Sequence, residues 1–168
     1  MGDRLRGPGT TLPALFLIVA TLGACKSDPT GPILQVEGTY TGDWTFEAFD
    51  ETGALTSTNT CPGSITLSEQ EGRSFGGTFL VTAAGDCEGL SPISGELVNG
   101  EVRADGGLEF TLTVLPFVGP GAAGCTLVGG TNGMNGAVTG AALSVFTTAR
   151  LVCPAGDGQV QIRMEGTR

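Results

Sequence analysis

The sequence predicts an all-β protein: a small antiparallel up-and-down β-barrel of about eight strands, preceded by a cleaved N-terminal signal helix. Apolar and polar residues alternate with a period of two in many short segments, which is typical of strands with one buried face. Turn-forming Gly, Asn and Asp residues separate these segments at hairpin spacing. Gly supplies 29 of the 168 residues. Several glycines fall in phase with the buried face, where sharply coiled strands need a residue without a side chain.

Residues 1–24 are predicted to be an export signal that is removed from the mature protein. Arg4 and Arg6 form a short basic segment, and an apolar stretch over residues 12–22 follows it. This stretch is shorter than the roughly 20 apolar residues of a membrane span, but it suits the core of a signal peptide. A buried helix of a globular core is the alternative interpretation.

The run Leu22-Gly23-Ala24-Cys25 follows the apolar stretch and resembles the lipobox of bacterial lipoproteins. The resemblance implies that a diacylglycerol group is attached to the Cys25 thiol and that Cys25 becomes the first residue after cleavage. Cleavage nearby by an ordinary signal peptidase, which leaves Cys25 as a free thiol, is the alternative. Several acyl chains at about 0.8 kcal/mol per buried CH₂ would hold the protein firmly on a bilayer.

The residues after the lipobox divide into a tether and one folded domain. Residues 25–36 are rich in Pro, Gly and polar residues and are predicted to be a short flexible tether. Residues 37–168 are predicted to form the barrel, since their length is that of a single domain. Lys26 stands after the lipidated cysteine, and by resemblance to the sorting rule of Gram-negative lipoproteins this favours the outer membrane. The protein would then face the periplasm or the cell surface.

The first predicted strand covers residues 39–48, in which polar and apolar residues alternate strictly. The run from Gly38 to Trp44, GTYTGDW, looks like the opening strand of lipocalin- and avidin-type barrels, where a Gly-x-Trp begins the first strand. In lipocalins an Arg of the last strand lies across that Trp. Arg168 has the parity for this position, whereas Arg163 does not. The resemblance implies a barrel fold and no particular function.

The later strands are predicted from the same alternation. The residues assigned to buried faces are, in chain order, Ile65 and Leu67; Phe75, Gly77, Phe79 and Val81; Ile93, Gly95 and Leu97; Val102 and Ala104; Leu108, Phe110, Leu112 and Val114; and Val160, Ile162, Met164 and Gly166. Residues 137–152 are ambiguous, because their Ala content favours a helix whereas their β-branched and aromatic residues favour a strand with a bulge.

Turn signals separate the predicted strands. Asn99-Gly100 is predicted to form a two-residue hairpin turn, since Asn-Gly between alternating segments favours this turn. The other predicted turns are at Glu71-Gly72, Ala84-Gly85-Asp86, Asp105-Gly106-Gly107, Asn132-Gly133, Asn135-Gly136 and Gly156-Asp157-Gly158.

A barrel is favoured over a sandwich because the connections look sequential and short. The tripeptide Glu-Gly-Thr occurs at residues 37–39 and again at 165–167, which indicates a seam where the first strand meets the last. An eight-stranded barrel has an interior that side chains fill or that holds one small ligand.

Four cysteines remain besides Cys25, and an even number in an exported chain predicts two disulfides. In hairpin order Cys61 and Cys87 lie near the same end of the barrel, and Cys125 and Cys153 bracket the ambiguous segment in the same way. The predicted pairs are therefore Cys61 with Cys87 and Cys125 with Cys153. A metal site is the competing interpretation, but it lacks the CxxC spacing and His ligands of such sites.

Charge and composition narrow the function. A net charge of −9 with only 8 basic residues argues against nucleic acid as a partner. The absence of His removes the usual general base and the commonest metal ligand. No catalytic residue, metal site or cofactor is therefore predicted. Carboxylates cluster at Glu47-Asp50-Glu51, Glu69-Glu71 and Asp86-Glu88. They are interpreted as solvated surface acids, and an envelope hydrolase acting through two of them is the alternative.

Two features are candidates for binding. Five aromatic residues are predicted to face the inside of the barrel, where they either pack the core or line a ligand cavity: Tyr40, Trp44, Phe46, Phe79 and Phe110. The indole N–H of Trp44 needs a partner, either Arg168 or a backbone carbonyl. The apolar loop 115–124 is either an exposed contact patch or a plug over the barrel mouth.

The sequence thus predicts a lipid-anchored envelope protein that acts as a non-catalytic binding or interaction module. Its partner would be a small apolar ligand in the barrel or an envelope protein that contacts the loops, besides the membrane that holds the lipid at Cys25.

Overall fold

The computed structural model describes residues 32–116, 125–128, 132–154 and 156–168. The predicted signal helix, Cys25 and most of the apolar loop 115–124 lie outside this part of the chain. Within it, no helix has the length and hydropathy needed to cross a membrane.

Strands make up the described fold, apart from one short 3₁₀ turn, η1. In chain order the elements are β1 (Gly38–Asp50), β2 (Leu55–Glu71), β3 (Ser74–Val81), η1 (Gly85–Cys87), β4 (Ile93–Val102), β5 (Gly107–Leu112), β6 (Thr126–Val128), β7 (Gly133–Thr139), β8 (Ala142–Val152) and β9 (Gly158–Thr167).

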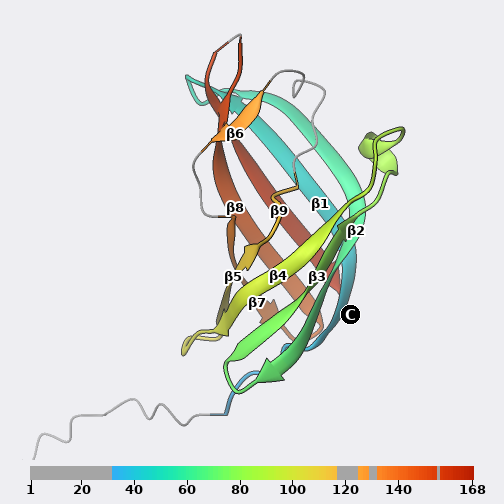
Figure 1. The fold of residues 1–168 in the computed structure, drawn as a ribbon, viewed down its shortest axis with the longest axis vertical. Coiled ribbons are helices and arrows are strands. Elements are labelled where there is room, and N and C mark those ends of the chain that lie inside the picture. Colours follow the sequence, from blue (N-terminus) through green and yellow to red (C-terminus); the bar gives the residue numbers. More distant parts are fainter. Residues whose placement is uncertain (1–31, 117–124, 129–131, 155) are drawn as a thin grey trace, which may run out of the picture.

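Eight of these strands close into an antiparallel barrel (Figure 1). Each strand pairs with the next, except that β5 pairs directly with β7, and β9 returns to pair with β1. The strand β6 stands outside this circuit: it pairs with residues 150–152 of β8, beyond Phe146, where the pairing of β8 with the start of β7 stops. The all-β, up-and-down barrel predicted from the alternation is confirmed.

The seam between β1 and β9 contains the second copy of the repeated tripeptide, residues 165–167, but its partners are residues 41–43 and not the first copy at 37–39. Gly42 pairs with Gly166 and Asp43 with Glu165. A Cβ added at Gly42 would lie 1.9 Å from the carbonyl oxygen of Glu165, so the two strands approach more closely than any other residue would permit. Gly77 serves the same purpose in β3, where a Cβ would lie 2.0 Å from the carbonyl oxygen of Thr66. These contacts confirm the predicted role of glycines on the buried face.

The predicted hairpin at Asn99-Gly100 is wrong, because both residues lie inside β4. Asn99 has a φ of 54° and interrupts the register of β4 with β5, so it forms a bulge in a continuous strand. Gly100 is buried, and a Cβ there would lie 2.4 Å from the carbonyl oxygen of Phe75. The chain reverses instead at residues 103–106, where the Gly106 N–H donates to the Arg103 carbonyl at 3.0 Å.

Three further expectations are corrected. Asn135-Gly136 lies inside β7 rather than in a turn, since it pairs on both sides with β5 and β8. Ala104 falls in the turn after β4 and is exposed. Val114 is 49% exposed, because β5 already ends at Leu112. The ambiguous residues 137–152 form the end of β7, a tight turn at residues 140–141 and all of β8.

The two ends of the barrel differ. The turn end carries the short connections at residues 72–73, 103–106 and 140–141, together with the first described residues and the end of β9 (Figure 1). The loop end carries the β1–β2 hairpin tip, the η1 connection, the segment that contains β6, and the β8–β9 hairpin.

Candidate functional site

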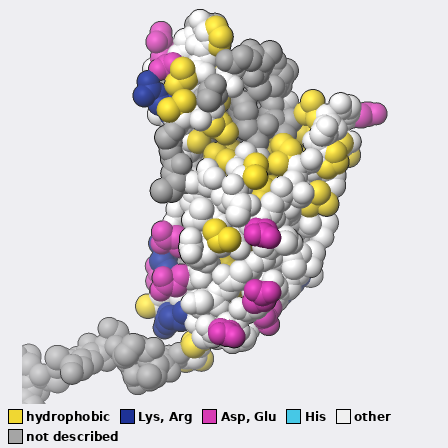
Figure 2. All heavy atoms as spheres, in the orientation of Figure 1, with side chains coloured by type: hydrophobic (Ala, Val, Ile, Leu, Met, Phe, Trp, Pro, Cys, Tyr) yellow, Lys and Arg dark blue, Asp and Glu magenta, His cyan; other side chains and the backbone are white. Residues whose placement is uncertain are grey.

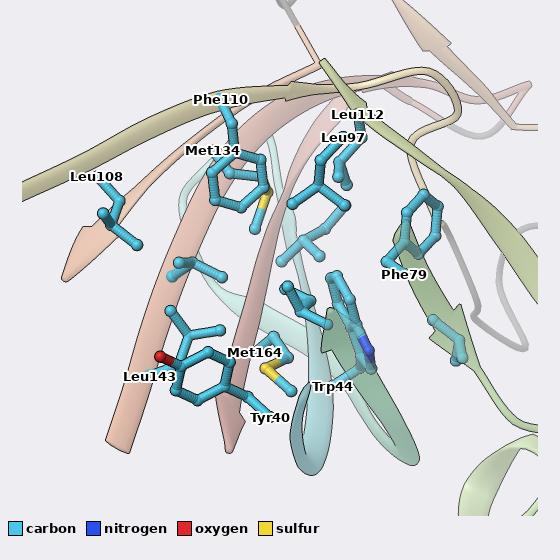
Figure 3. Packing of buried hydrophobic residues seen from close by; sticks show 14 of the residues in the cluster. Tyr40, Trp44, Phe79, Leu97, Leu108, Phe110, Leu112, Met134, Leu143 and Met164 are labelled. Atoms are coloured by element: carbon cyan, nitrogen blue, oxygen red, sulfur yellow. The ribbon is translucent and has the colours of Figure 1, made fainter. Parts of the chain in front are cut away.

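The centre of the barrel is organised around Trp44, which has no exposed surface. Its indole N–H donates to the Leu80 carbonyl at 3.2 Å, and its ring centroid lies 5.7 Å from that of Phe79 (Figure 3). Gly63 makes room for the ring, since a Cβ there would lie 2.6 Å from Trp44 Cδ1. Of the two partners predicted for the indole, the backbone carbonyl is therefore the one that the structure shows.

The other aromatic residues predicted to face inside are also buried. Tyr40 donates its hydroxyl to the Val36 carbonyl at 2.8 Å, and the rings of Phe75 and Phe110 meet edge to face at 6.0 Å between centroids. The five predicted side chains, which are 0–2% exposed, are Tyr40, Trp44, Phe46, Phe79 and Phe110.

Aliphatic side chains and methionines occupy the space between these rings. Met134 lies beside Phe110, and Met164 lies between Trp44 and Tyr40 in Figure 3. Both methionines have no exposed surface. A side chain without exposed surface leaves no room for a water-sized sphere against it, so the interior around these residues is filled by side chains.

At the turn end, Arg168 lies over Tyr40 and not over Trp44, the position that the resemblance to lipocalins suggested. Burial raises the pKa of the Tyr40 phenol, while the nearby Arg168 charge lowers it by a smaller amount. At neutral pH the phenol is therefore a neutral donor in a closed barrel end.

At the loop end, two disulfides attach the connections to the strands. Cys61 of β2 is bonded to Cys87 of η1, and Cys125 is bonded to Cys153, which follows β8. Both pairs are those predicted from hairpin order. Asp86 strengthens the first attachment, because its carboxylate accepts the Thr60 N–H at 2.8 Å.

A groove of about 760 Å³ lies on the outer flank of the barrel at the loop end. Its lining residues are Phe49, Asp50, Glu51, Thr52, Gly53, Thr148, Ala149, Arg150, Asp157, Gly158, Gln159 and Gln161. These residues are far apart in the sequence and become neighbours only when the last strand meets the first as the barrel closes. Gln159 and Gln161 alternate with the predicted inward residues Val160 and Ile162, which places the two glutamines on the outward face but names no neighbour.

In the predicted acidic cluster Glu47-Asp50-Glu51, Asp50 makes hydrogen bonds within its own hairpin. The Asp50 carboxylate accepts hydrogen bonds from the Thr52 hydroxyl at 2.6 Å and the Ala54 N–H at 3.0 Å. These donors, the Thr52 hydroxyl first, hold the pKa of Asp50 below its ordinary value. Within the described residues, no group of three or more His, Cys, Asp or Glu is placed to hold a metal ion.

Comparison with known proteins adds no relative: no protein-family model, curated protein or solved structure matches this chain.

Proposed function

We propose that this protein is a lipid-anchored, non-catalytic binding module of the bacterial envelope that presents its loop end to a protein partner. The observation that carries the proposal is the difference between the two ends of the barrel. One end has only tight turns, whereas at the other end the connections after β3 and β5 are longer, and each contains a cysteine of a disulfide. Loops held by a rigid scaffold are where binding residues concentrate in proteins.

The filled interior supports a site on the surface rather than in the lumen. Trp44 and Tyr40 have no exposed surface, and Met164 between them and Met134 beside Phe110 are equally enclosed. A ligand in the lumen would need to displace several of these side chains, and a well-packed core resists such insertion, since even a few added methylene groups typically cost about 1–3 kcal/mol. We therefore favour a protein partner over a small apolar ligand inside the barrel.

Exposed apolar side chains at the loop end support the same choice. Leu90 and Val114 are each 49% exposed, and Leu80 is 38% exposed near the end of β3. On the face shown in Figure 2, apolar side chains gather in the upper half, toward the loop end; acidic side chains are spread over the lower half and also stand at the upper edges. Apolar patches rimmed by polar groups are typical of protein–protein contacts.

The position of the N-terminal segment gives the module an orientation. Gln70 holds this segment at the turn end: its side chain accepts the Val36 N–H and donates to the Leu34 carbonyl, both at 2.9 Å. A lipid at Cys25 would be separated from Leu34 by a chain that spans at most about 30 Å. The turn end would then face the membrane, and the loop end would point away from it.

Hydrolysis through carboxylates is the alternative function. A glycosidase needs one carboxyl group with a raised pKa, which acts as the general acid. The hydrogen bonds to Asp50 lower its pKa, so Asp50 does not fit the role of that acid. We favour non-catalytic binding on the contrast between the two barrel ends described above.

Site-specific photocrosslinking in the intact envelope tests the proposal. A photoreactive residue replaces Leu90 at the loop end in one strain and Asp105 at the turn end in another. We expect a discrete crosslinked protein from position 90 that is lost when Val114→Asp is added, and lipid or no product from position 105. Equal protein crosslinks from the two ends, or a product from position 90 that Val114→Asp leaves unchanged, would contradict the proposal.

A further inference from the structure

The groove at the loop end lies where three strands run side by side on the outside of the barrel. The strands are β1, β9 and β8, which pair with one another in that order and lie side by side in Figure 1. The lining comes from residues near the ends of these strands, from the β1–β2 hairpin tip and from Asp157 in the β8–β9 hairpin.

The floor of the groove is a row of three side chains across the sheet. Phe49 pairs with Gln159, and Gln159 pairs with Arg150 on its other side. Gln161 lies two residues further along β9, next to Thr148. Because side chains two apart share one face of a strand, both amides point outward on the same side as the partly exposed Phe49 ring.

The charged lining residues stabilise the two hairpins beside the groove. Asp50 accepts hydrogen bonds from the backbone and hydroxyl of Thr52, which orders the β1–β2 hairpin tip. Arg150 and Asp157 form an ion pair that joins β8 to the start of β9. With Glu51 the lining holds three carboxylates and one guanidinium, so the groove carries negative charge and repels anions.

We propose that this groove binds an uncharged saccharide. A sugar ring has an apolar C–H face that packs on an aromatic ring, and its hydroxyl groups both donate and accept hydrogen bonds. Phe49 provides the aromatic surface, and the amides of Gln159 and Gln161 each offer both donor and acceptor atoms. An apolar surface with a few orienting polar groups is the general composition of small-molecule sites.

The proposal does not rest on the lipid anchor or on the protein partner, because the groove is on the flank of the barrel and not among the apolar side chains of the loop end. Failure of saccharide binding would leave the crosslinking result from position 90 unaffected. The reverse also holds, so the two proposals fail separately.

Binding can be measured on the full-length protein in a detergent that contains no sugar. The probes are chitotetraose, maltotetraose and cellotetraose as neutral oligosaccharides, tetragalacturonate as an anionic one, and spermine as a cation. We expect saturable binding of at least one neutral probe by calorimetry, and no binding of tetragalacturonate. Gln159→Ala and Gln161→Ala should each weaken the affinity by roughly three- to tenfold, the usual effect of one hydrogen bond.

Matched controls separate the groove from the rest of the surface. Phe49→Ala should reduce binding, whereas Phe146→Ala should not, since Phe146 is an exposed Phe on β8 outside the groove. Gln35→Ala is the corresponding control for the two glutamines. If Phe49→Ala fails to fold, as judged by its thermal unfolding, the glutamine variants still decide the matter.

Three results would overturn the proposal. The first is that none of the neutral probes binds at concentrations up to about 10 mM; only binding weaker than about −2.7 kcal/mol would escape detection there. The second is that the glutamine variants bind the neutral probe as tightly as the wild type. The third is that spermine binds in their place, which would assign the groove to cations.

Discussion

The guanidinium carbon of Arg168 lies 5.5 Å from the centre of the Tyr40 ring, at the turn end of the barrel. The same guanidinium donates to the Glu37 carbonyl at 2.6 Å, and the Arg168 backbone N–H donates to the Ala141 carbonyl at 3.0 Å. Arg168, the residue that follows β9, therefore joins the segment before β1 to the β7–β8 turn. This arrangement closes the seam of the barrel at the end opposite the disulfides.

Replacing Arg168 tests this closure. We expect Arg168→Ala to lower the free energy of unfolding by about 1–2 kcal/mol, because it removes a cation–π contact and a charged hydrogen bond at an exposed site. Urea denaturation measures the change. Arg163→Ala is the matched control, since Arg163 lies on the outer face of β9, the strand that Arg168 follows. If the two variants lose the same free energy of unfolding, Arg168 has no special role in closing the barrel.

Stability at alkaline pH should depend on Tyr40. Its pKa is raised in the folded protein by burial, above the ordinary value of 10.0. The neutral phenol therefore contributes stability that is fully present below about pH 10 and is lost as the pH rises through the folded pKa. Tyr40 is the only tyrosine, so tyrosinate absorbance reports its titration directly.

The same titration should respond to Arg168. The charge of Arg168 lowers the pKa of Tyr40, so Arg168→Ala should move the titration to higher pH. A midpoint that stays in place, or that falls, would contradict the cation–π geometry.

The two disulfides should differ in how much they contribute to the free energy of unfolding. In the chain-entropy model each is worth roughly 3–4 kcal/mol, because the closed loops are of similar length. Cys61 and Cys87 are also part of the core, whereas Cys125 and Cys153 are only partly buried. We expect the double Ala variant of the first pair to lose more stability, because it also leaves a cavity. Urea denaturation without reductant measures both variants, and equal losses would argue against a core role for the first pair.

Gly63 should be intolerant of a side chain. A Cβ at this position would lie 2.2 Å from the Leu80 carbonyl oxygen and 2.6 Å from Trp44. Gly63→Ala should destabilise the protein by about 1–3 kcal/mol through overpacking. Gly76→Ala is the control, because a Cβ there meets its nearest neighbour at 3.6 Å, an ordinary contact.

Fluorescence of Trp44, the single tryptophan, reports the same site. Its emission should be blue-shifted in the native protein, should shift to the red on unfolding in reducing denaturant, and should change in Gly63→Ala. Fatty acids, retinoids and quinones should leave the emission unchanged, since the interior is filled. A saturable change with any of these ligands would restore the lumen as a binding site.

The predicted anchor can be tested independently of the fold. Cys25→Ser should leave an uncleaved or mislocalised precursor, because the thiol that carries the lipid is gone. A radioactive fatty acid should label the wild type and not the variant. Absence of label in a bacterium that processes lipoproteins would show that the lipobox interpretation is wrong.

Much of the barrel could be predicted from the sequence, because the residues of one short segment are enough to assign the two faces of a strand. A strict alternation such as that of residues 39–48 assigns each side chain to one face of a strand, and burial of Tyr40, Trp44 and Phe46 confirms the assignment. Disulfide pairing was also accessible, since consecutive hairpins alternate between the two ends of a barrel. The prediction from local sequence was wrong at Asn99-Gly100. This pair favours a turn, but in the structure it forms a bulge within β4.

The sequence by itself determined the class of fold and the inward face of the strictly alternating segments, since hydrophobic burial at period two acts on neighbouring residues. Hairpin order determined the two cysteine pairs, whereas β8 stayed ambiguous until the structure placed it between β7 and β9. Only the tertiary structure decided which outward residues become neighbours. Phe49 and Gln159 are far apart in the chain and meet because β9 closes onto β1. Closure likewise decided that Arg168 covers Tyr40 and that the rings fill the interior. These outcomes depend on strand register and barrel width, which are set by the packing of all eight strands together.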